Sequence, residues 1–121
     1  MAETTFSEIG KTEAVRALFE GSGYEQTDIC SFRSSHGKTV QSSVMSVEGI
    51  DFDLTYFPLK HLGYKSVIRA TGGIYAAMGS PKSLAVRLAV SSKLDFGRIK
   101  ELWSGITAAA KEHGYVSVSL D

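Results

Sequence analysis

The spacing of apolar residues divides this chain into helical and extended stretches around one long central helix. Between Pro58 and Gly79, apolar residues recur every three to four positions, which predicts a helix with one buried face. Pro58 suits the first turn, and Gly79-Ser80-Pro81 is expected to end the helix, with Gly79 tolerating a left-handed backbone. The residues expected on the buried face are Leu59, Leu62, Val67, Ala70, Ile74, Ala77 and Met78.

A second long helix is predicted over Phe96–His113, with Asp95 as its N-cap and Gly114 as its C-terminal glycine. A shorter amphipathic helix is predicted over Thr12–Glu20. The second long helix carries a broad apolar stripe, formed by Phe96, Ile99, Leu102, Trp103, Ile106, Ala109 and Ala110.

Four other segments alternate between apolar and polar residues and are predicted to be strands. Thr27–Arg33 and Lys38–Val47 are expected to form a hairpin, and Lys82–Ser91 and Tyr115–Leu120 complete the set. The predicted order is α-β-β-α-β-α-β, with a sheet of about four strands and two long helices on one face, an α+β fold. In the third strand Leu84, Val86, Leu88 and Val90 face one way, and Ala85, Arg87 and Ala89 face the other.

Length and charge narrow the classes of protein to consider. The chain has 121 residues, which is the size of one domain, expected to span residues 1–121. Thirteen basic and thirteen acidic residues balance, so no net field favours nucleic acid or an anionic membrane. No secretory signal or membrane-spanning run is found, and the single cysteine, Cys30, excludes an internal disulfide. A cytoplasmic protein is expected.

Two adjacent glycines, Gly72 and Gly73, interrupt the central helix. Each costs about 1 kcal/mol of helix stability relative to alanine. The pair therefore indicates either a close approach of another backbone or the relic of a functional position.

The candidate chemistry is sparse. Asp51 and Asp53, with Glu48 and Asp28, could supply oxygen ligands for Mg²⁺ or Ca²⁺, or could simply be solvated carboxylates. Gly73 to Ser83 differs from a phosphate-binding loop, because Ser80-Pro81 separates the second glycine from Lys82 and the segment closes a helix. The sequence contains no Ser-His-Asp constellation and no His/Cys cluster with metal-ligand spacing.

The run VEGIDFDLTYFPLKHLGYKSVIRATGGIYAAMGSPKSLAVRLAVS resembles the N-terminal domain of thiamine-monophosphate kinase, a member of the PurM-like (aminoimidazole-ribonucleotide synthase-related) superfamily. The detailed match covers residues 47–114, with a looser match at Ser7-Glu8-Ile9-Gly10. The resemblance implies a PurM N-terminal-like fold and a two-fold dimer in which two sheets pair. The family's C-terminal domain, which completes the substrate site, is absent from this sequence.

The resemblance also implies aspartates that hold Mg²⁺ against ATP phosphates, and this sequence departs from most of them. Ile29–Ser35 replaces the first aspartate pair, Val44 the second position and Gly73 the third, while Asp121 keeps the fourth. Asp51 stands where the family has histidine. The residues left as candidates for ligand binding are Glu48, Asp51, Asp53 and Asp121.

Three functions remain open. The first is a noncatalytic pseudoenzyme without cofactor or metal that acts by self-association, as a homodimer through the sheet face, or by binding a protein partner. The second is a small-ligand or nucleotide-binding module at a dimer interface. The third is an ATP-dependent thiamine-phosphate kinase-like enzyme with a rearranged site, whose missing domain a separate chain could supply.

Overall fold

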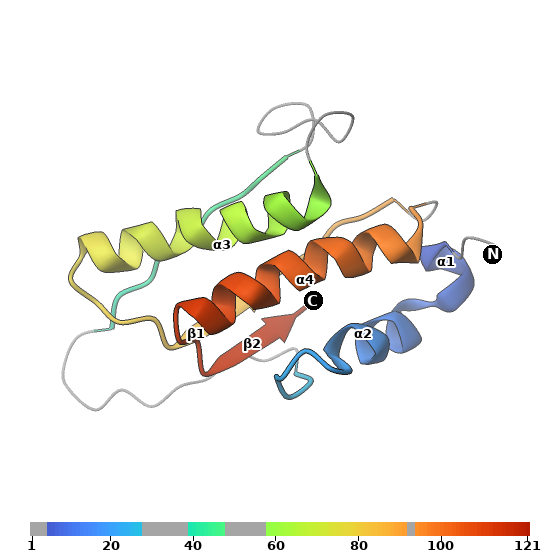
Figure 1. Ribbon diagram of the computed structural model, residues 1–121, viewed down its shortest axis with the longest axis horizontal. Coiled ribbons are helices and arrows are strands. Elements are labelled where there is room, and N and C mark those ends of the chain that lie inside the picture. The colour runs from blue at the N-terminus through green and yellow to red at the C-terminus, as the bar shows by residue number, and fades with distance from the viewer. Residues whose placement is uncertain (1–4, 28–38, 48–57, 92–93) are drawn as a thin grey trace.

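The computed structural model describes residues 5–27, 39–47, 58–91 and 94–121, which form a mixed α+β structure (Figure 1). Two small helices come first, α1 (Phe6–Ile9) and α2 (Lys11–Phe19). The long helix α3 (Leu59–Ala76), the strand β1 (Ser83–Val86), the helix α4 (Phe96–Glu112) and the strand β2 (Ser117–Leu120) follow. None of the helices in the described ranges is both long and apolar enough to cross a membrane.

The strands β1 and β2 pair in parallel, with Leu84 beside Val118 and Val86 beside Leu120. A parallel pair needs a crossover connection, and α4 supplies it. Both strands are shorter than predicted: β1 covers Ser83–Val86 of the predicted Lys82–Ser91, and β2 covers Ser117–Leu120 of the predicted Tyr115–Leu120. Past the paired strands, Asp121 N–H donates to Val86 O and Leu88 N–H donates to Asp121 O.

The helices α3 and α4 lie side by side and run in the same direction (Figure 1). Two glycines form their crossing point. A Cβ on Gly63 would overlap the carbonyl oxygen of Leu102, and a Cβ on Gly105 would overlap that of Lys60. Glycine at both positions therefore lets the two backbones come into direct contact.

One apolar core joins the helices to the inner face of the sheet. The stripe predicted on α4 is confirmed: Ile99 is 2% exposed, Trp103 3% and Ala110 0%. The alternation predicted along the third strand is also confirmed, since Leu84, Val86, Leu88 and Val90 pack against the core while Ala85, Arg87 and Ala89 are exposed. The core further includes Ala14, Leu18, Phe19, Val67, Val118 and Leu120.

The helix boundaries follow local chemistry. The Asp95 carboxylate accepts from Gly97 N–H at 3.2 Å, which confirms the predicted N-cap of α4. Gly114 has φ 75°, and Gly114 N–H and Tyr115 N–H bond to Lys111 O and Ala110 O, which completes a Schellman motif.

The end of α3 differs from the prediction. The left-handed residue is Met78, with φ 62°, and not Gly79. Met78 N–H bonds to Tyr75 O and Gly79 N–H to Ile74 O, the same Schellman pattern one residue earlier than expected. The predicted buried face extends to Met78, but the last buried residue of α3 is Thr71. The helix α4 ends opposite Tyr75, which contacts His113, so in the described structure α4 does not cover the last turns of α3.

The predicted four-stranded sheet is not seen in the described ranges, where the sheet has two strands. Residues 39–47 of the strand predicted over Lys38–Val47 belong to no strand. They lie along α3 instead: Ser46 Oγ accepts from Arg69 Nη1 at 3.1 Å, and Ser42 lies against Gly73. Most of the other hairpin strand, residues 28–33, lies outside the described residues, as does Cys30.

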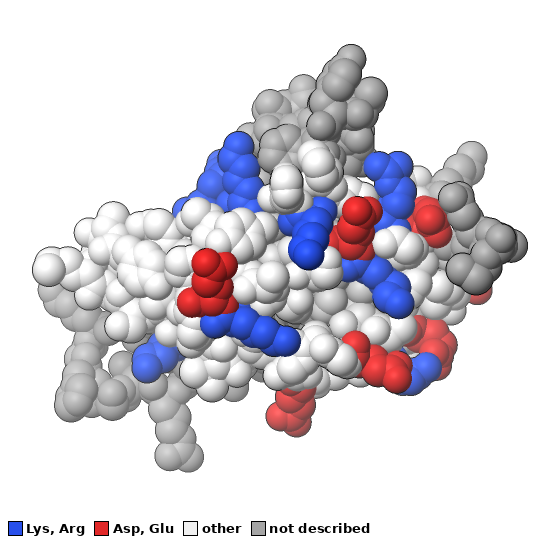
Figure 2. Space-filling model, in the orientation of Figure 1, with Lys and Arg blue, Asp and Glu red and all other residues white. Residues whose placement is uncertain are grey.

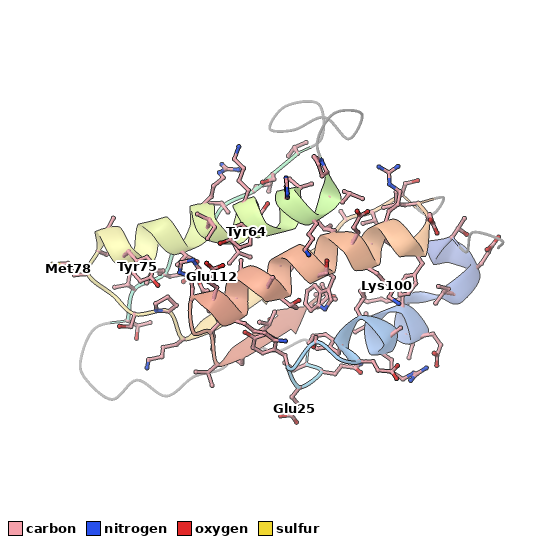
Figure 3. The ribbon with its side chains drawn as sticks, viewed as in Figure 1. Glu25, Tyr64, Tyr75, Met78, Lys100 and Glu112 are labelled. Carbon is pink, nitrogen blue, oxygen red and sulfur yellow. The ribbon has the colours of Figure 1, made fainter. Side chains whose placement is uncertain are left out.

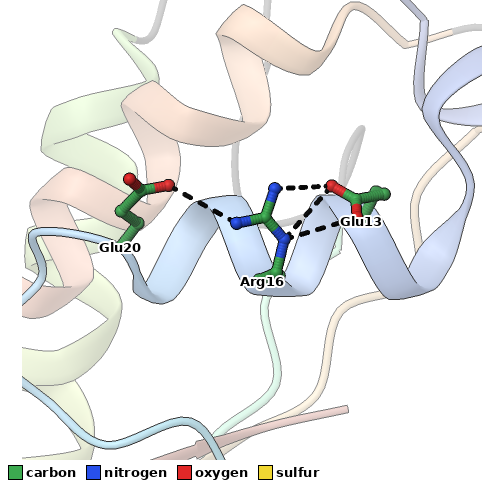
Figure 4. A network of polar contacts seen from close by, with 3 residues as sticks. All are labelled: Glu13, Arg16 and Glu20. Carbon is green, nitrogen blue, oxygen red and sulfur yellow. Dashed lines mark hydrogen bonds and ion pairs between the residues drawn. The ribbon is translucent and has the colours of Figure 1, made fainter.

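An exposed ion network stabilises α2 (Figure 4). Arg16 bonds to Glu13 with a shortest distance of 2.7 Å and lies 3.9 Å from Glu20. The hydrogen bond and charge of Arg16 lower the pKa of Glu13. All three side chains are more than half exposed, so the network supports the helix locally and builds no site.

Candidate functional site

The structure brings together two of the positions where the resemblance implies metal ligands. Gly73 lies in the last turns of α3, and a Cβ there would lie 2.5 Å from Ser42 Oγ. Val44 lies between Ser42, which is against Gly73, and Ser46, which bonds to Arg69. Residues 39–47 therefore place Val44 near the same part of α3. Valine and glycine side chains have no atom that can coordinate Mg²⁺.

Asp121 lies elsewhere. Its carboxylate oxygen Oδ1 is 3.1 Å from Lys11 Nζ, and its backbone bonds to β1. Figure 1 shows the C-terminus beside the middle of α4, well away from the far end of α3. Glu48, Asp51 and Asp53 lie outside the described residues. Across the residues that the structure does describe, no three His, Cys, Asp or Glu side chains gather closely enough to hold a metal ion.

A row of polar pairs along α3 joins it to the end of α4 and the residues after it (Figure 3). Tyr64 OH donates to Glu112 Oε2 at 2.5 Å. The Thr71 and Tyr115 hydroxyls bond to each other at 2.7 Å in the interior. Near the end of α3, the Tyr75 hydroxyl lies 3.1 Å from His113 Nδ1.

These pairs link α3 to the end of α4 and the residues after it. The hydroxyl groups of Tyr64, Thr71, Tyr75 and Tyr115 each have a hydrogen-bond partner in them. The hydrogen bond to Glu112, together with burial and the carboxylate charge, raises the pKa of Tyr64 above its usual value near 10. The phenol therefore stays protonated and donates to Glu112 across the neutral range. The sequence analysis missed this row because its members are 38 to 48 residues apart in the chain.

Most of the exposed large apolar side chains of the described residues lie on two segments of the chain. The C-terminal half of α3 with the turn after it, residues 70–81, and the extended segment beside it, residues 39–47, contain no charged residue. We call these two segments the uncharged surface, and Figure 2 shows that the end of the molecule where α3 stops is largely free of charge. The exposed large hydrophobic residues of the described chain are Val40, Val44, Met45, Val47, Tyr75, Met78 and Val116.

The strand β1 also has an open side. Lys82 O accepts from Val116 N–H, just before β2, while Val86 O and Leu88 N–H bond to Asp121, just after it. Since successive residues of a strand point their backbone groups to opposite edges, those of Ala85 and Arg87 point away from β2. The sheet found in the described residues has no strand at that edge, and the side chains of Ala85, Arg87 and Ala89 are exposed on its outer face.

Comparison with known proteins returned no match: no family model, no curated protein and no solved structure is similar to this chain. The surface described above is therefore interpreted from its own residues.

Proposed function

We propose that this chain is a noncatalytic relative of the thiamine-monophosphate kinase N-terminal domain and that it acts by self-association. The observation that supports self-association is the outer side of β1 and the residues after it, where a strand edge that no described strand covers adjoins the exposed residues Ala85 and Ala89. Figure 1 shows that residues 39–47 pass behind α3 and that β1 lies behind α4, on the same side of the helix pair. The proposed contact surface combines this face of β1 with the exposed residues Val40, Met45 and Val47.

A second copy of the chain is the simplest cover for this surface. An edge strand exposes unpaired N–H and C=O groups that another strand can satisfy. In a two-fold interface the same surface patch meets itself, so a patch rich in charge of one sign would face like charge. Residues 39–47 carry no charge, and Arg87 is a charged side chain on the adjoining outer face.

The four-stranded PurM-like sheet remains part of this proposal. One contact supports a strand on the other side of β2, where Leu120 N–H bonds to Thr27 O at 3.0 Å. Thr27 begins the first predicted strand, and a strand there would leave β1 as the edge available to a second copy.

The absence of kinase activity is proposed from the chemistry of two residues. Phosphoryl transfer depends on positioning and on metal ions that neutralise phosphate charge. Val44 and Gly73 cannot hold such ions, and they lie on neighbouring segments where the resemblance implies ligands.

Light scattering on the purified full chain at micromolar concentration tests self-association. We expect a mass of about twice the 13.0 kDa of one chain. A mass of one chain at all accessible concentrations would contradict the proposal.

Calorimetric titration with ATP, with and without Mg²⁺, tests the absence of catalysis. We expect no binding at sub-millimolar nucleotide. A Mg²⁺-dependent dissociation constant in the micromolar range would instead support a working kinase-like site, and metal-independent binding would support a nucleotide-binding module.

A further inference from the structure

Two methionines of this chain are unusually exposed. Met78 is 95% exposed and Met45 is 78% exposed. Methionine is an apolar residue that normally fills gaps in a core. Two such side chains in solvent therefore point to a role at the surface.

The backbone fixes the exposure of Met78. The residue occupies the left-handed position of the Schellman motif that ends α3, with φ 62°. At that position the chain turns away from the helix axis toward Gly79, and the side chain extends past the last helical turn. Figure 3 shows Met78 at the far end of the molecule, beyond Tyr75.

Met45 and Met78 belong to the two parts of one surface. Met45 lies in residues 39–47 and Met78 in residues 70–81, the two segments of the uncharged surface. Val40 Cβ would lie 3.7 Å from a Cβ on Gly79, and Ser42 lies against Gly73, so the segments are in contact. Both thioethers are therefore part of one surface whose two segments carry no charged residue, although Arg69 of the preceding turn of α3 reaches Ser46 beside Met45.

We propose that Met45 and Met78 are oxidation sites that control the association of this chain. This inference rests on the proposed function, because Met45 lies in the proposed contact surface and Met78 lies beside it, next to Gly79, which Val40 contacts. A sulfur lone pair attacks one oxygen of a peroxide, the O–O bond breaks, and that oxygen stays on sulfur. The thioether is oxidised to the sulfoxide by two electrons, and hydrogen peroxide is reduced to water.

Oxidation changes the property on which the association depends. A sulfoxide is a strong hydrogen-bond acceptor, and burying it without a donor is unfavourable. Neither segment of the uncharged surface carries a lysine or arginine, and the guanidinium of Arg69, which reaches residues 39–47, already donates to Ser46 Oγ. A two-fold dimer would contain each sulfoxide twice, so oxidation acts on the dimer from both sides of the interface.

The experiment compares the wild-type chain with the double variant Met45→Leu/Met78→Leu, before and after treatment with hydrogen peroxide. Leucine keeps the apolar volume and cannot form a sulfoxide. Peptide mass spectrometry measures the oxidation of each methionine and of Cys30 and Trp103, and light scattering measures the mass. The double variant keeps Met1, Cys30 and Trp103, and so controls for oxidation at these other residues.

We expect both proteins to be dimeric before treatment. After treatment, the wild-type mass should fall toward 13.0 kDa, with a dissociation constant raised at least on the order of tenfold, while the double variant stays dimeric. Methionine sulfoxide reductase should restore the wild-type dimer.

Two outcomes separate this inference from the proposed function. A wild-type dimer that persists with both sulfoxides formed, or a double variant that dissociates equally, would overturn the oxidation sites and leave self-association standing. A wild-type chain that is monomeric before peroxide treatment would overturn the proposed self-association. It would also overturn the proposed control of that association by oxidation.

Discussion

At the scale of single residues, the same helix-ending motif occurs twice with different residues in its left-handed position. Gly114 fills it after α4 and Met78 after α3, with φ 75° and 62°. Glycine adopts this conformation freely, whereas a residue with a Cβ is strained there by about 1–2 kcal/mol. The strain at Met78 persists because Met78 N–H and Gly79 N–H both bond to carbonyls of the last turn.

Replacing Met78 should therefore stabilise the fold. We expect Met78→Gly to raise the free energy of unfolding by about 0.5–1 kcal/mol, since the relief of strain exceeds the greater entropy of glycine in the unfolded chain. The matched control, Gly114→Ala, should lower it by about 1 kcal/mol. Urea denaturation measures both, and a loss of stability in Met78→Gly would show that the methionine side chain makes a contact that outweighs its strain.

The raised pKa of Tyr64 predicts a loss of stability in alkali. Unfolded tyrosine ionises near pH 10, before Tyr64 does in the folded protein. The stabilising contribution is therefore complete below about pH 10 and is lost as the pH rises through the raised pKa. Burial raises the pKa of Tyr24 in the same direction, so Tyr64 accounts for only part of the loss.

Urea denaturation of Tyr64→Phe at about pH 8 and about pH 10.5 tests this assignment. The variant should lose less stability between the two conditions than the wild type does. The control variant Glu112→Gln keeps an oxygen acceptor without the charge. Its loss of stability between the two pH values should lie between those of the wild type and Tyr64→Phe. An identical loss in wild type and Tyr64→Phe would exclude Tyr64 as its source.

At the scale of elements, the α3–α4 contact explains which glycines matter. A Cβ on Gly63 or Gly105 would overlap a backbone carbonyl of the other helix. A Cβ on Gly72 would meet nothing within 4 Å, and one on Gly73 would meet only the Ser42 side chain. The close approach of two backbones considered for Gly72 and Gly73 is therefore found at Gly63 and Gly105 instead.

Two alanine substitutions in α3 should have opposite effects. Gly63→Ala should lower the free energy of unfolding by about 2 kcal/mol or more, because separating the helices outweighs the gain of about 1 kcal/mol in helix propensity. Gly72→Ala, in the same helix, should raise it by about 1 kcal/mol. Thermal and urea unfolding measure both, and equal effects would mean that the crossing adjusts without strain.

At the scale of the whole molecule, the two sides of the sheet have different surroundings. The inner side packs on the helices and buries Val118 completely. On the outer side, β1 and the residues after it expose Ala85 and Ala89, beside an edge that no strand in the described ranges covers. The proposed self-association uses this difference.

A charge on the outer face should prevent the association without unfolding the chain. Ala85→Glu would bury a carboxylate in the proposed interface on both copies, so we expect a mass of one chain by light scattering. Ala108→Glu adds the same charge on an exposed position of α4 and should leave the dimer intact. Circular dichroism checks that both variants fold. A dimeric Ala85→Glu variant would place the contact elsewhere on the molecule.

The sequence by itself determined the features that neighbouring residues set among themselves. The period of three to four residues located α4 and its buried stripe, and Asp95 and Gly114 marked its ends, because capping and amphipathicity depend on residues a few positions apart. The alternation of Lys82–Ser91 likewise predicted which side chains of the strand face the core. The existence of α3 followed from the same local pattern, although its last turns did not stay buried.

Tertiary structure alone decided the features that join distant parts of the chain. The contact of Gly63 with Leu102, the hydrogen bond of Tyr64 to Glu112 and the parallel pairing of β1 with β2 depend on how α3 and α4 lie together. The same holds for residues 39–47, whose alternation suits a strand but whose contacts are with α3. A period of two specifies an extended backbone, and only the surrounding elements determine whether that backbone finds a partner strand.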